Sequence, residues 1–321
     1  MEKEKLLEVR HLKKYFSTPA GQLHAVDDVS FDIAKGETLG VVGESGCGKS
    51  TLGRAVLRLH EPTSGEVLFR GENILAYSNK QMKDLKKEMQ LIFQDPFSSL
   101  NPRMTVSQAI ALPLLIQGVY DKKDKAALNQ KVRELMNLVG LAQRFVNSYP
   151  HELDGGRRQR IGIARALSLH PSFIVCDEPV SALDVSIQAQ ILNLMQDLQN
   201  EMGLTYMFIT HDLSVVRYIS DDIMVMYVGT VVEKSSAEEL FEHPMHPYTQ
   251  GLLSAIPLPV IDQPAAQVIL QGEITSPVNP KPGCRFADRC PHATEACTKV
   301  QPELKEVSPN HFVACHNLGT F

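Results

Sequence analysis

The segment 43–51, GESGCGKST, combines three glycines with a lysine and three hydroxyl residues. It matches the G-x-x-x-x-G-K-[ST] pattern, in which backbone N–H groups surround a phosphate chain at the start of a helix. Lys49 can reach the outer phosphates, and the Ser50 hydroxyl can ligate Mg²⁺. A glycine-rich turn with an unrelated lysine is the alternative. The apolar TLGVV before the segment and the helical LGRAVLRL after it favour the phosphate site.

Two further segments place polar side chains directly after apolar runs. FIVCDEP (173–179) ends in Asp177 and Glu178, and YMFIT is followed at once by His211. Beside a phosphate loop, an aspartate can hold Mg²⁺ through its waters, and a neighbouring glutamate can orient an attacking water. A histidine at another strand's carboxyl end can contact the terminal phosphate. Together these residues predict nucleotide hydrolysis.

The elements that would position these residues alternate along the chain. The apolar runs 38–42, 173–177 and 206–210 are typical of buried strands in a mainly parallel sheet. Apolar residues recur at helical spacing from Val132 to Val139 and again from Ile187 to Leu198. Strands that alternate with helices predict an α/β fold.

Two stretches depart from this alternation. Between about residues 95 and 160 only helical patterns and loops occur, which predicts a helical subdomain inserted into the α/β core. After residue 256 the periodicity fades, and nine of the 19 prolines fall in 256–321. We therefore expect a nucleotide-binding domain over 1–255 and a small, loop-rich C-terminal tail over 256–321.

Composition narrows the class of protein. The 321 residues carry a net charge of −5, which argues against a protein that coats nucleic acid with positive charge. The longest apolar run, near IMVMYVGTVV, is about half the roughly 20 residues that a membrane span needs. The N-terminus has no apolar segment like that of a signal peptide. These features predict a soluble chain and leave a membrane partner possible.

Taken in order, the motifs resemble those of ATP-binding cassette (ABC) ATPases over residues 7–255. They are the phosphate loop, FQDP (93–96), the Gly-Gly segment 153–157, IVCDEPVSALD (174–184) and THD (210–212). The resemblance implies a P-loop NTPase core that binds ATP and Mg²⁺ and hydrolyses ATP. It also implies that two subunits pack head to tail around two ATP molecules.

The resemblance assigns roles to individual positions. The catalytic residues would be Glu178, His211, Gln94 and Lys49, and Mg²⁺ would be held through Ser50, Gln94 and Asp177. Adenine would stack on Phe16, which fits best by its spacing after Lys14, or on Tyr15. The loop contacts to ATP would come from Gly43, Glu44, Ser45, Gly46, Cys47, Gly48, Lys49, Ser50 and Thr51. Across the dimer interface, the signature Asp154, Gly155, Gly156 and Arg157 and the downstream Asp184 would face the partner's nucleotide.

Three segments are similar to those of ATPases that drive oligopeptide, dipeptide and nickel importers: 93–106, 177–190 and HPYTQGLLSAIP (246–257). This likeness implies peptide import, with nickel import as the alternative. It implies as partners two membrane permease subunits, a second ABC ATPase and, indirectly, an extracytoplasmic peptide-binding protein. The chain would be cytoplasmic and peripheral on the inner face of the cell membrane.

Non-transport ABC ATPases are a weaker alternative. Those of DNA repair carry a long coiled coil between the phosphate loop and the signature, and here only 105 residues separate Lys49 from Asp154 (154 − 49), without sustained heptads. Translation-associated relatives usually carry two cassettes in one chain, whereas one phosphate loop occurs here.

The signature departs from the family pattern. Leu-Ser-Gly-Gly-Gln would be expected, and the chain has Leu153-Asp154-Gly155-Gly156-Arg157. An aspartate carboxylate has no proton to donate to a phosphate near neutral pH and repels an anion, an effect that Arg157 can partly offset. The variant fits an asymmetric heterodimer whose other site this chain serves poorly. It is also compatible with tolerance, if backbone amides dominate, or with an introduced change.

Four of the six cysteines fall in the last 38 residues, at Cys284, Cys290, Cys297 and Cys315. Their C-x5-C-x6-C-x17-C spacing lacks the C-x-x-C pair of common zinc ribbons and matches neither common ferredoxin spacing. From spacing alone, an iron–sulfur cluster, zinc and four unliganded thiols remain open, with His292, His311 and His316 as competing ligands. The importer resemblance favours an iron–sulfur cluster (4Fe-4S), with zinc as the alternative, clamping the tail.

Overall fold

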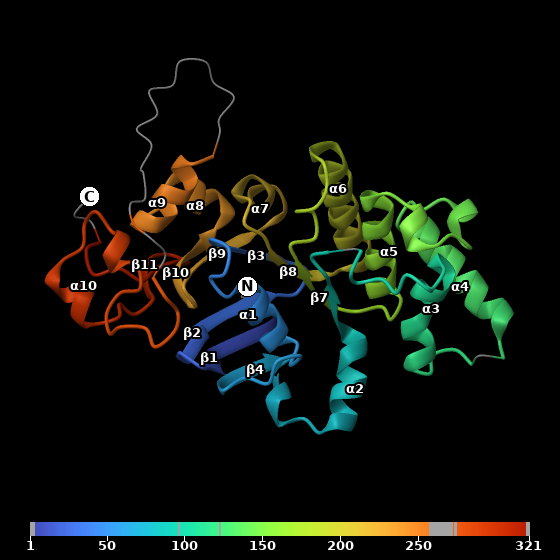
Figure 1. The fold of residues 1–321 in the computed structure, drawn as a ribbon, viewed down its shortest axis with the longest axis horizontal. Helices are drawn as coiled ribbons and strands as arrows, with labels where there is room; N and C mark the ends of the chain where they lie inside the picture. Colours follow the sequence, from blue (N-terminus) through green and yellow to red (C-terminus); the bar gives the residue numbers. More distant parts are fainter. Residues whose placement is uncertain (1–3, 96, 122, 257–271, 273–274, 319–321) are drawn as a thin grey trace, which may run out of the picture. The chain divides into compact units, whose positions relative to one another are not determined.

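The computed structural model describes residues 4–95, 97–121, 123–256, 272 and 275–318. The chain divides into two compact units, one of 1–75 together with 208–321 and one of 76–207 (Figure 1). The C-terminal residues 275–318 thus belong to the same unit as the N-terminal strands. Pro96 of the FQDP motif and the tail segment 257–271 lie outside the described residues. The predicted boundaries at 95–160 and at 255/256 stay predictions.

The first unit contains the two N-terminal strands, the phosphate loop and all the elements after residue 212. Its elements are β1 (Lys5–Thr18), β2 (Gly21–Ala34), β3 (Thr38–Val42), α1 (Lys49–Val56), β4 (Ser64–Phe69), β5 (Glu72–Asn73), α7 (Leu213–Ile219), β9 (Asp222–Tyr227), β10 (Thr230–Ser236), α8 (Ala237–Glu242), α9 (Pro247–Ser254), α10 (Glu295–Lys299), β11 (Lys305–Ser308) and β12 (His311–Val313).

The second unit is mainly helical around a short parallel strand pair. Its elements are α2 (Asn79–Glu88), β6 (Met89–Ile92), α3 (Val106–Ile116), α4 (Lys125–Leu138), α5 (Gly155–Leu167), β7 (Phe173–Asp177) and α6 (Val185–Met202). Strand β8 (Thr205–Ile209) runs across the boundary between the units.

In the first unit, the phosphate loop lies close to a strand of each of two sheets. One is antiparallel with the order β2-β1-β4-β5, and its long β1–β2 hairpin covers residues 5–34 (Figure 1). The other places β11, β12, β10, β9 and β3 side by side, with β3 and β9 parallel. All five residues of β3 are buried, as expected for a strand covered on both faces. This strand delivers the chain directly into the loop at Gly43.

In the second unit, β6 and β7 pair in parallel and β7 is buried throughout. Helix α6 buries Ile191, Leu192, Met195 and Leu198, which recur at helical spacing. Asp184 caps its N-terminus, and Gly203 at φ +65° ends it in a left-handed turn that favours glycine.

The predicted mixed α/β class is confirmed, and so are the three predicted strands, which correspond to β3, β7 and β8. The expected helices correspond to α4 and α6. The antiparallel β1–β2–β4 sheet was not foreseen from the sequence. Its strands carry mixed, half-exposed residues, so a period-two pattern is weak there. Among the residues that the structure describes, no helix combines the length and apolar character that crossing a membrane requires.

The C-terminal tail is anchored by packing and by strand pairing. Phe286 is 1% exposed and lies edge-on to Tyr227, with ring centroids 5.2 Å apart, and beside Tyr248 at 5.5 Å. Strand β12 extends the main sheet by pairing with β10, where Glu233 lies opposite Val313. The tail therefore shares the hydrophobic core of the first unit.

A buried polar network fixes the same junction. The Glu233 carboxylate accepts hydrogen bonds from the backbone N–H groups of Met245, at 2.7 Å, and His246, at 3.0 Å. The His311 ring lies 2.7 Å from Glu233 Oε1, and this hydrogen bond raises the pKa of His311 against the lowering effect of burial. Every group in the network has a partner, as a buried carboxylate requires.

Replacing Phe286 with alanine should lower the free energy of unfolding by about 3–5 kcal/mol, because it leaves a cavity between two buried tyrosines. Urea unfolding followed by circular dichroism measures the change. Val307→Ala is the control, since Val307 is an exposed tail residue, and its effect should stay within about 0.5 kcal/mol. Equal costs for the two variants would show that the tail is not packed on the core.

Candidate functional site

The backbone of the phosphate loop is built for close approach. Gly48 is the N-cap of α1 at φ +105°, and a Cβ there would lie 2.0 Å from the Ala25 carbonyl oxygen. At Gly43 a Cβ would lie 2.2 Å from Met226 O. No side chain caps the first turn of α1, whereas Asp154 and Asp184 cap α5 and α6. Uncapped N–H groups at a helix start suit an anion, so the loop fits the phosphates of ATP.

Lys49 is held inside this loop. Its side chain is 4% exposed, and its Nζ donates to the backbone oxygens of Gly43, at 2.6 Å, and Glu44, at 3.0 Å. Cys47 Sγ lies 3.8 Å from the same Nζ, and burial raises the pKa of the Cys47 thiol. A buried ammonium directed to the loop's own carbonyls is positioned to exchange them for phosphate oxygens.

The two aromatic candidates for adenine stacking differ in their surroundings. The Tyr15 ring stacks on His24, with centroids 3.9 Å apart, and its hydroxyl donates to Asp27. Phe16 makes an edge contact with His60, with ring centroids 5.6 Å apart, and Lys14 Nζ lies over its ring, 4.7 Å from the centroid. Since Tyr15 has one face covered and its hydroxyl bonded, the geometry favours Phe16 for stacking.

His211 lies at the edge of the first unit where β3 ends. The backbone N–H of Thr210 donates to Val41 O at 3.1 Å, which places the end of β8 beside the strand that enters the phosphate loop. In the next residue, the Asp212 carboxylate caps α7 by accepting from the N–H groups of Ser214 and Val215. His211 thus lies between Thr210, which is bonded to β3, and Asp212, which caps α7.

In the second unit, the predicted metal and water residues gather at the end of β7. Asp177 is buried, and the next residue, Glu178, has a left-handed φ of +47°. Gln94 Nε2 donates to Glu178 Oε2 at 2.9 Å, although the two residues are 84 positions apart. This contact brings together Gln94 and Glu178, two of the predicted catalytic residues.

The unusual signature has a local structural role. Asp154 is the N-cap of α5, where Oδ1 accepts from the Arg157 N–H at 2.8 Å and Oδ2 pairs with the Arg157 guanidinium at 2.5 Å. The guanidinium also lies 5.0 Å from the Phe145 ring centroid. Aspartate is a strong N-cap, so the substitution for serine preserves helix capping while it changes the charge of the loop.

The signature glycines have a packing function besides the predicted one. A Cβ on Gly156 would lie 2.6 Å from Ile187 Cγ2 on α6, and one on Gly155 would lie 3.0 Å from Leu183 Cδ2. Both neighbours belong to the Asp184 segment or the helix that it caps. The Asp184 carboxylate accepts from Ile187 N–H at 3.0 Å. Glycine therefore allows the signature helix and the Asp184 segment to pack closely.

The prediction of a metal centre in the tail is wrong. Within the described part of the chain, no group of three or more His, Cys, Asp or Glu side chains is arranged to hold a metal ion. Cys284 and Cys290 pack against the apolar cluster around Phe286, and burial raises the pKa of Cys284 to about 11. Burial also raises the pKa of Cys290 and Cys315. Cys284 and Cys290 lie in apolar packing, so the described residues support neither an iron–sulfur cluster nor zinc.

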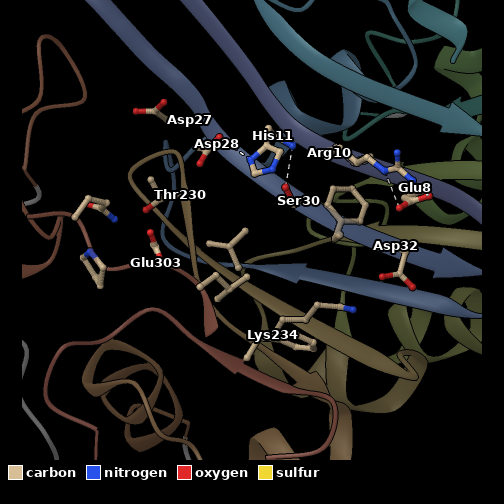
Figure 2. A pocket seen from close by; sticks show the side chains of 17 residues that line it. Glu8, Arg10, His11, Asp27, Asp28, Ser30, Asp32, Thr230, Lys234 and Glu303 are labelled. Atoms are coloured by element: carbon tan, nitrogen blue, oxygen red, sulfur yellow. Dashed lines mark hydrogen bonds and ion pairs between the residues drawn. The ribbon is translucent and has the colours of Figure 1, made fainter. Parts of the chain in front are cut away.

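A cavity of about 720 Å³ lies elsewhere in the first unit, lined by residues of β1, β2 and β10 and by the segment 301–304 (Figure 2). Figure 2 shows that its charged groups meet their neighbours: Arg10 pairs with Glu8 at 2.8 Å, and His11 faces Asp28 at 3.2 Å. No residue of the phosphate loop lines it. This cavity is therefore separate from the nucleotide site.

Sequence reasoning missed the tail residues that contact the nucleotide-binding segments. Tyr248 Oη accepts from the Glu44 N–H at 2.9 Å, and Arg289 makes two hydrogen bonds to the Glu44 carboxylate. Arg285 pairs with Asp27 at 2.5 Å. Burial would raise the pKa of Asp27, but hydrogen bonds from His24 and Tyr15 and the charge of Arg285 lower it. Separations of more than 200 positions leave no spacing signal for such contacts.

Substituting Asp154 separates capping from charge. Asp154→Ala should lower the free energy of unfolding by about 1 kcal/mol, because the first turn of α5 loses its side-chain acceptor. Asp154→Ser should change the free energy of unfolding by only about 0.3 kcal/mol, since serine also caps a helix. Urea unfolding of both variants measures the difference. If the alanine variant were as stable as the serine variant, the capping role would be refuted.

Comparisons with known proteins agree with this geometry. Residues 26–181 match the ABC transporter family model, and residues 232–297 match the oligopeptide/dipeptide transporter C-terminal region. The chain is 51% identical to the oligopeptide transport ATP-binding protein AppF of Bacillus subtilis, over 98% of this chain and 97% of the relative. It is 54% identical to OppF of the same organism, over 97% and 96%. A putative peptide import ATP-binding protein of Brucella ovis is 52% identical, over 97% of each.

Solved structures show the same fold. A dimeric ATP-binding cassette in a post-hydrolysis state, bound to ADP and phosphate, aligns with a TM-score of 0.66 at 28% identity, covering 72% of this chain and 98% of that one. With matches of this extent in sequence and structure, the chain belongs to the ATP-binding subunits of the ABC transporter family, in the group that carries the oligopeptide/dipeptide transporter C-terminal region.

Proposed function

We propose that this chain hydrolyses ATP to drive the import of dipeptides or oligopeptides through a membrane permease. The observation that carries the proposal is the similarity over nearly the whole chain to peptide-import ATP-binding proteins, together with an intact phosphate loop. The relatives' names refer to peptides, which favours peptide over nickel as the cargo. A role in DNA repair has no comparable support.

From the roles that the family resemblance gives these residues, we infer in-line attack of water on the terminal phosphate. Glu178 would orient the attacking water, and its hydrogen bond from Gln94 supports that orientation. Lys49 would bind the outer phosphates and His211 the terminal one. Mg²⁺, held by Ser50, Gln94 and Asp177, would balance phosphate charge. Phe16 would stack on adenine.

Permease subunits would dock beside Gln94. The neighbouring Phe93 and Phe97 are 41% and 53% exposed, and their rings lie 5.6 Å and 5.0 Å from the guanidinium carbons of Arg165 and Arg158. Exposed aromatic rings held by arginines are typical of protein interfaces. We expect the chain to sit peripherally on the cytoplasmic face of the cell membrane, with an extracytoplasmic peptide-binding protein delivering the cargo.

The second ATP-binding subunit would be a different chain. The Asp154 carboxylate faces the start of α5, where the family's serine would donate to a partner's nucleotide. Arg157 pairs with this carboxylate and so partly neutralises it. This chain would keep a competent phosphate loop, while its signature segment would bind the partner's nucleotide less well. Such a difference between the two nucleotide sites suits an asymmetric heterodimer.

The import proposal predicts peptide-dependent turnover. ATP hydrolysis by the membrane assembly that co-purifies with this chain should rise when a peptide-loaded binding protein is added. Glu178→Gln should remove most of that rise, because glutamine does not accept the water's proton, while ATP binding is retained. Stimulation by a nickel-loaded binding protein alone would assign the cargo to metal, and absence of any co-purifying permease would contradict the proposal.

The heterodimer proposal predicts a gain of activity. Exchanging Asp154→Ser together with Arg157→Gln should raise turnover of the assembly several-fold, because a hydroxyl donor replaces a carboxylate at the partner's nucleotide. Steady-state hydrolysis at saturating ATP measures this, with Asp154→Ser alone for comparison. Unchanged turnover in the double variant would show that backbone amides suffice.

A further inference from the structure

An acidic side chain occupies the phosphate loop itself. Glu44 follows Gly43, and its backbone oxygen accepts from Lys49 Nζ at 3.0 Å, so it lies within the ring of groups that would bind a nucleotide. Its side chain is 25% exposed. An ATP molecule with Mg²⁺ carries net negative charge, and a carboxylate at this place repels it. The loop therefore needs a compensating charge.

Arg289 from the C-terminal tail meets this carboxylate along both oxygens. Its Nη1 donates to Glu44 Oε2 at 2.8 Å and its Nη2 to Oε1 at 3.0 Å. The arginine side chain is 6% exposed, and the hydrogen bonds to Glu44 raise the pKa of Arg289. Two parallel bonds of this kind are the geometry in which arginine holds a carboxylate most firmly.

The surrounding residues fix the arginine in place. Its guanidinium carbon lies 5.7 Å from the Tyr227 ring centroid and 6.0 Å from that of Phe286, and Nη1 also lies 3.4 Å from Tyr227 Oη. Tyr248, from α9, accepts the Glu44 N–H at 2.9 Å. Both the side chain and the amide of Glu44 are thus held by residues beyond position 208, within one compact unit.

We propose that Arg289 is a positioning residue for ATP: it neutralises Glu44, and through it the C-terminal tail sets the nucleotide affinity of the phosphate loop. The inference rests on the proposed nucleotide site and goes beyond it by giving the tail a part in ATP binding. Without the arginine, the Glu44 carboxylate would be uncompensated beside an anion. Removing the carboxylate as well would remove the repulsion.

Arg289 could affect ATP binding through its charge or only by supporting the fold of the tail, and a second substitution distinguishes these two roles. If Arg289 only braced the tail, a second substitution at Glu44 would leave binding as weak as before or weaken it further. If the arginine acts by neutralisation, the second substitution restores binding. The effect of adding the Glu44 substitution to the Arg289 variant therefore has opposite sign in the two cases, so one double-variant cycle distinguishes them.

The experiment measures the Kd of the full chain for Mg²⁺ with the non-hydrolysable ATP analogue AMP-PNP by calorimetry. Arg289→Gln should raise Kd about tenfold, and the double variant Arg289→Gln with Glu44→Gln should return it to within about twofold of the unsubstituted chain. Glu44→Gln alone removes the repelling carboxylate while the arginine keeps its charge, so it should lower Kd. Lys299→Gln is the matched control, since it breaks an exposed tail ion pair with Glu295 and should not change Kd.

Three further measurements keep the test decisive. The ratio of the Kd of Arg289→Gln to that of the unsubstituted chain should fall as ionic strength rises, because salt screens the repulsion between Glu44 and the nucleotide. If that variant folds poorly, Arg289→Lys keeps the charge, and its Kd should stay within about threefold. In the membrane assembly, Arg289→Gln should raise KM for ATP with little change in kcat.

An unchanged Kd in Arg289→Gln, or a double variant that binds as weakly as the single one, would overturn the proposal. Because the binding assay needs neither cargo nor permease, failure of the peptide-import proposal would appear in the membrane assembly, as turnover indifferent to peptide or as no co-purifying permease, and not in this Kd. The two failures are therefore distinguishable.

Discussion

The need to hold an anion with backbone N–H groups governs much of the first unit. A helix start binds phosphate only if no side chain occupies it, and Gly48 leaves the first turn of α1 uncapped. The same requirement brings the loop against the backbone at Ala25 and Met226, where only glycine fits. Ala25 lies in β2 and Met226 in β9, so the loop passes close to the backbone of both strands.

In the second unit, the predicted site residues also lie at the ends of strands and helices. Asp177 and Glu178 close β7, and Asp154 and Asp184 begin α5 and α6. The close contact of Gly156 with Ile187 joins the last two segments. A change in either would be transmitted to the other, because there is no room for independent movement at that contact.

The parts of the fold and site that the sequence predicted are those with local signals. The β3 and β7 strands are short apolar runs, and the phosphate loop is a contiguous motif between a strand and a helix. The contacts of Gln94 with Glu178 and of Arg289 with Glu44 join positions 84 and 245 residues apart, and no periodicity encodes them. The tail cysteines were misread because the importer resemblance implied a cluster that their spacing left open, whereas Cys284 and Cys290 pack in the apolar cluster.

The bidentate contact between Glu44 and Arg289 also bears on how such cassettes can be recombined. The C-terminal region follows the nucleotide-binding segments in the sequence and carries none of their motifs. Here Arg289 of the C-terminal region pairs with Glu44 inside the phosphate loop. A chimera whose new tail lacks an arginine at position 289 would leave the Glu44 carboxylate without this partner, so the tail and the residue at position 44 would have to be chosen together.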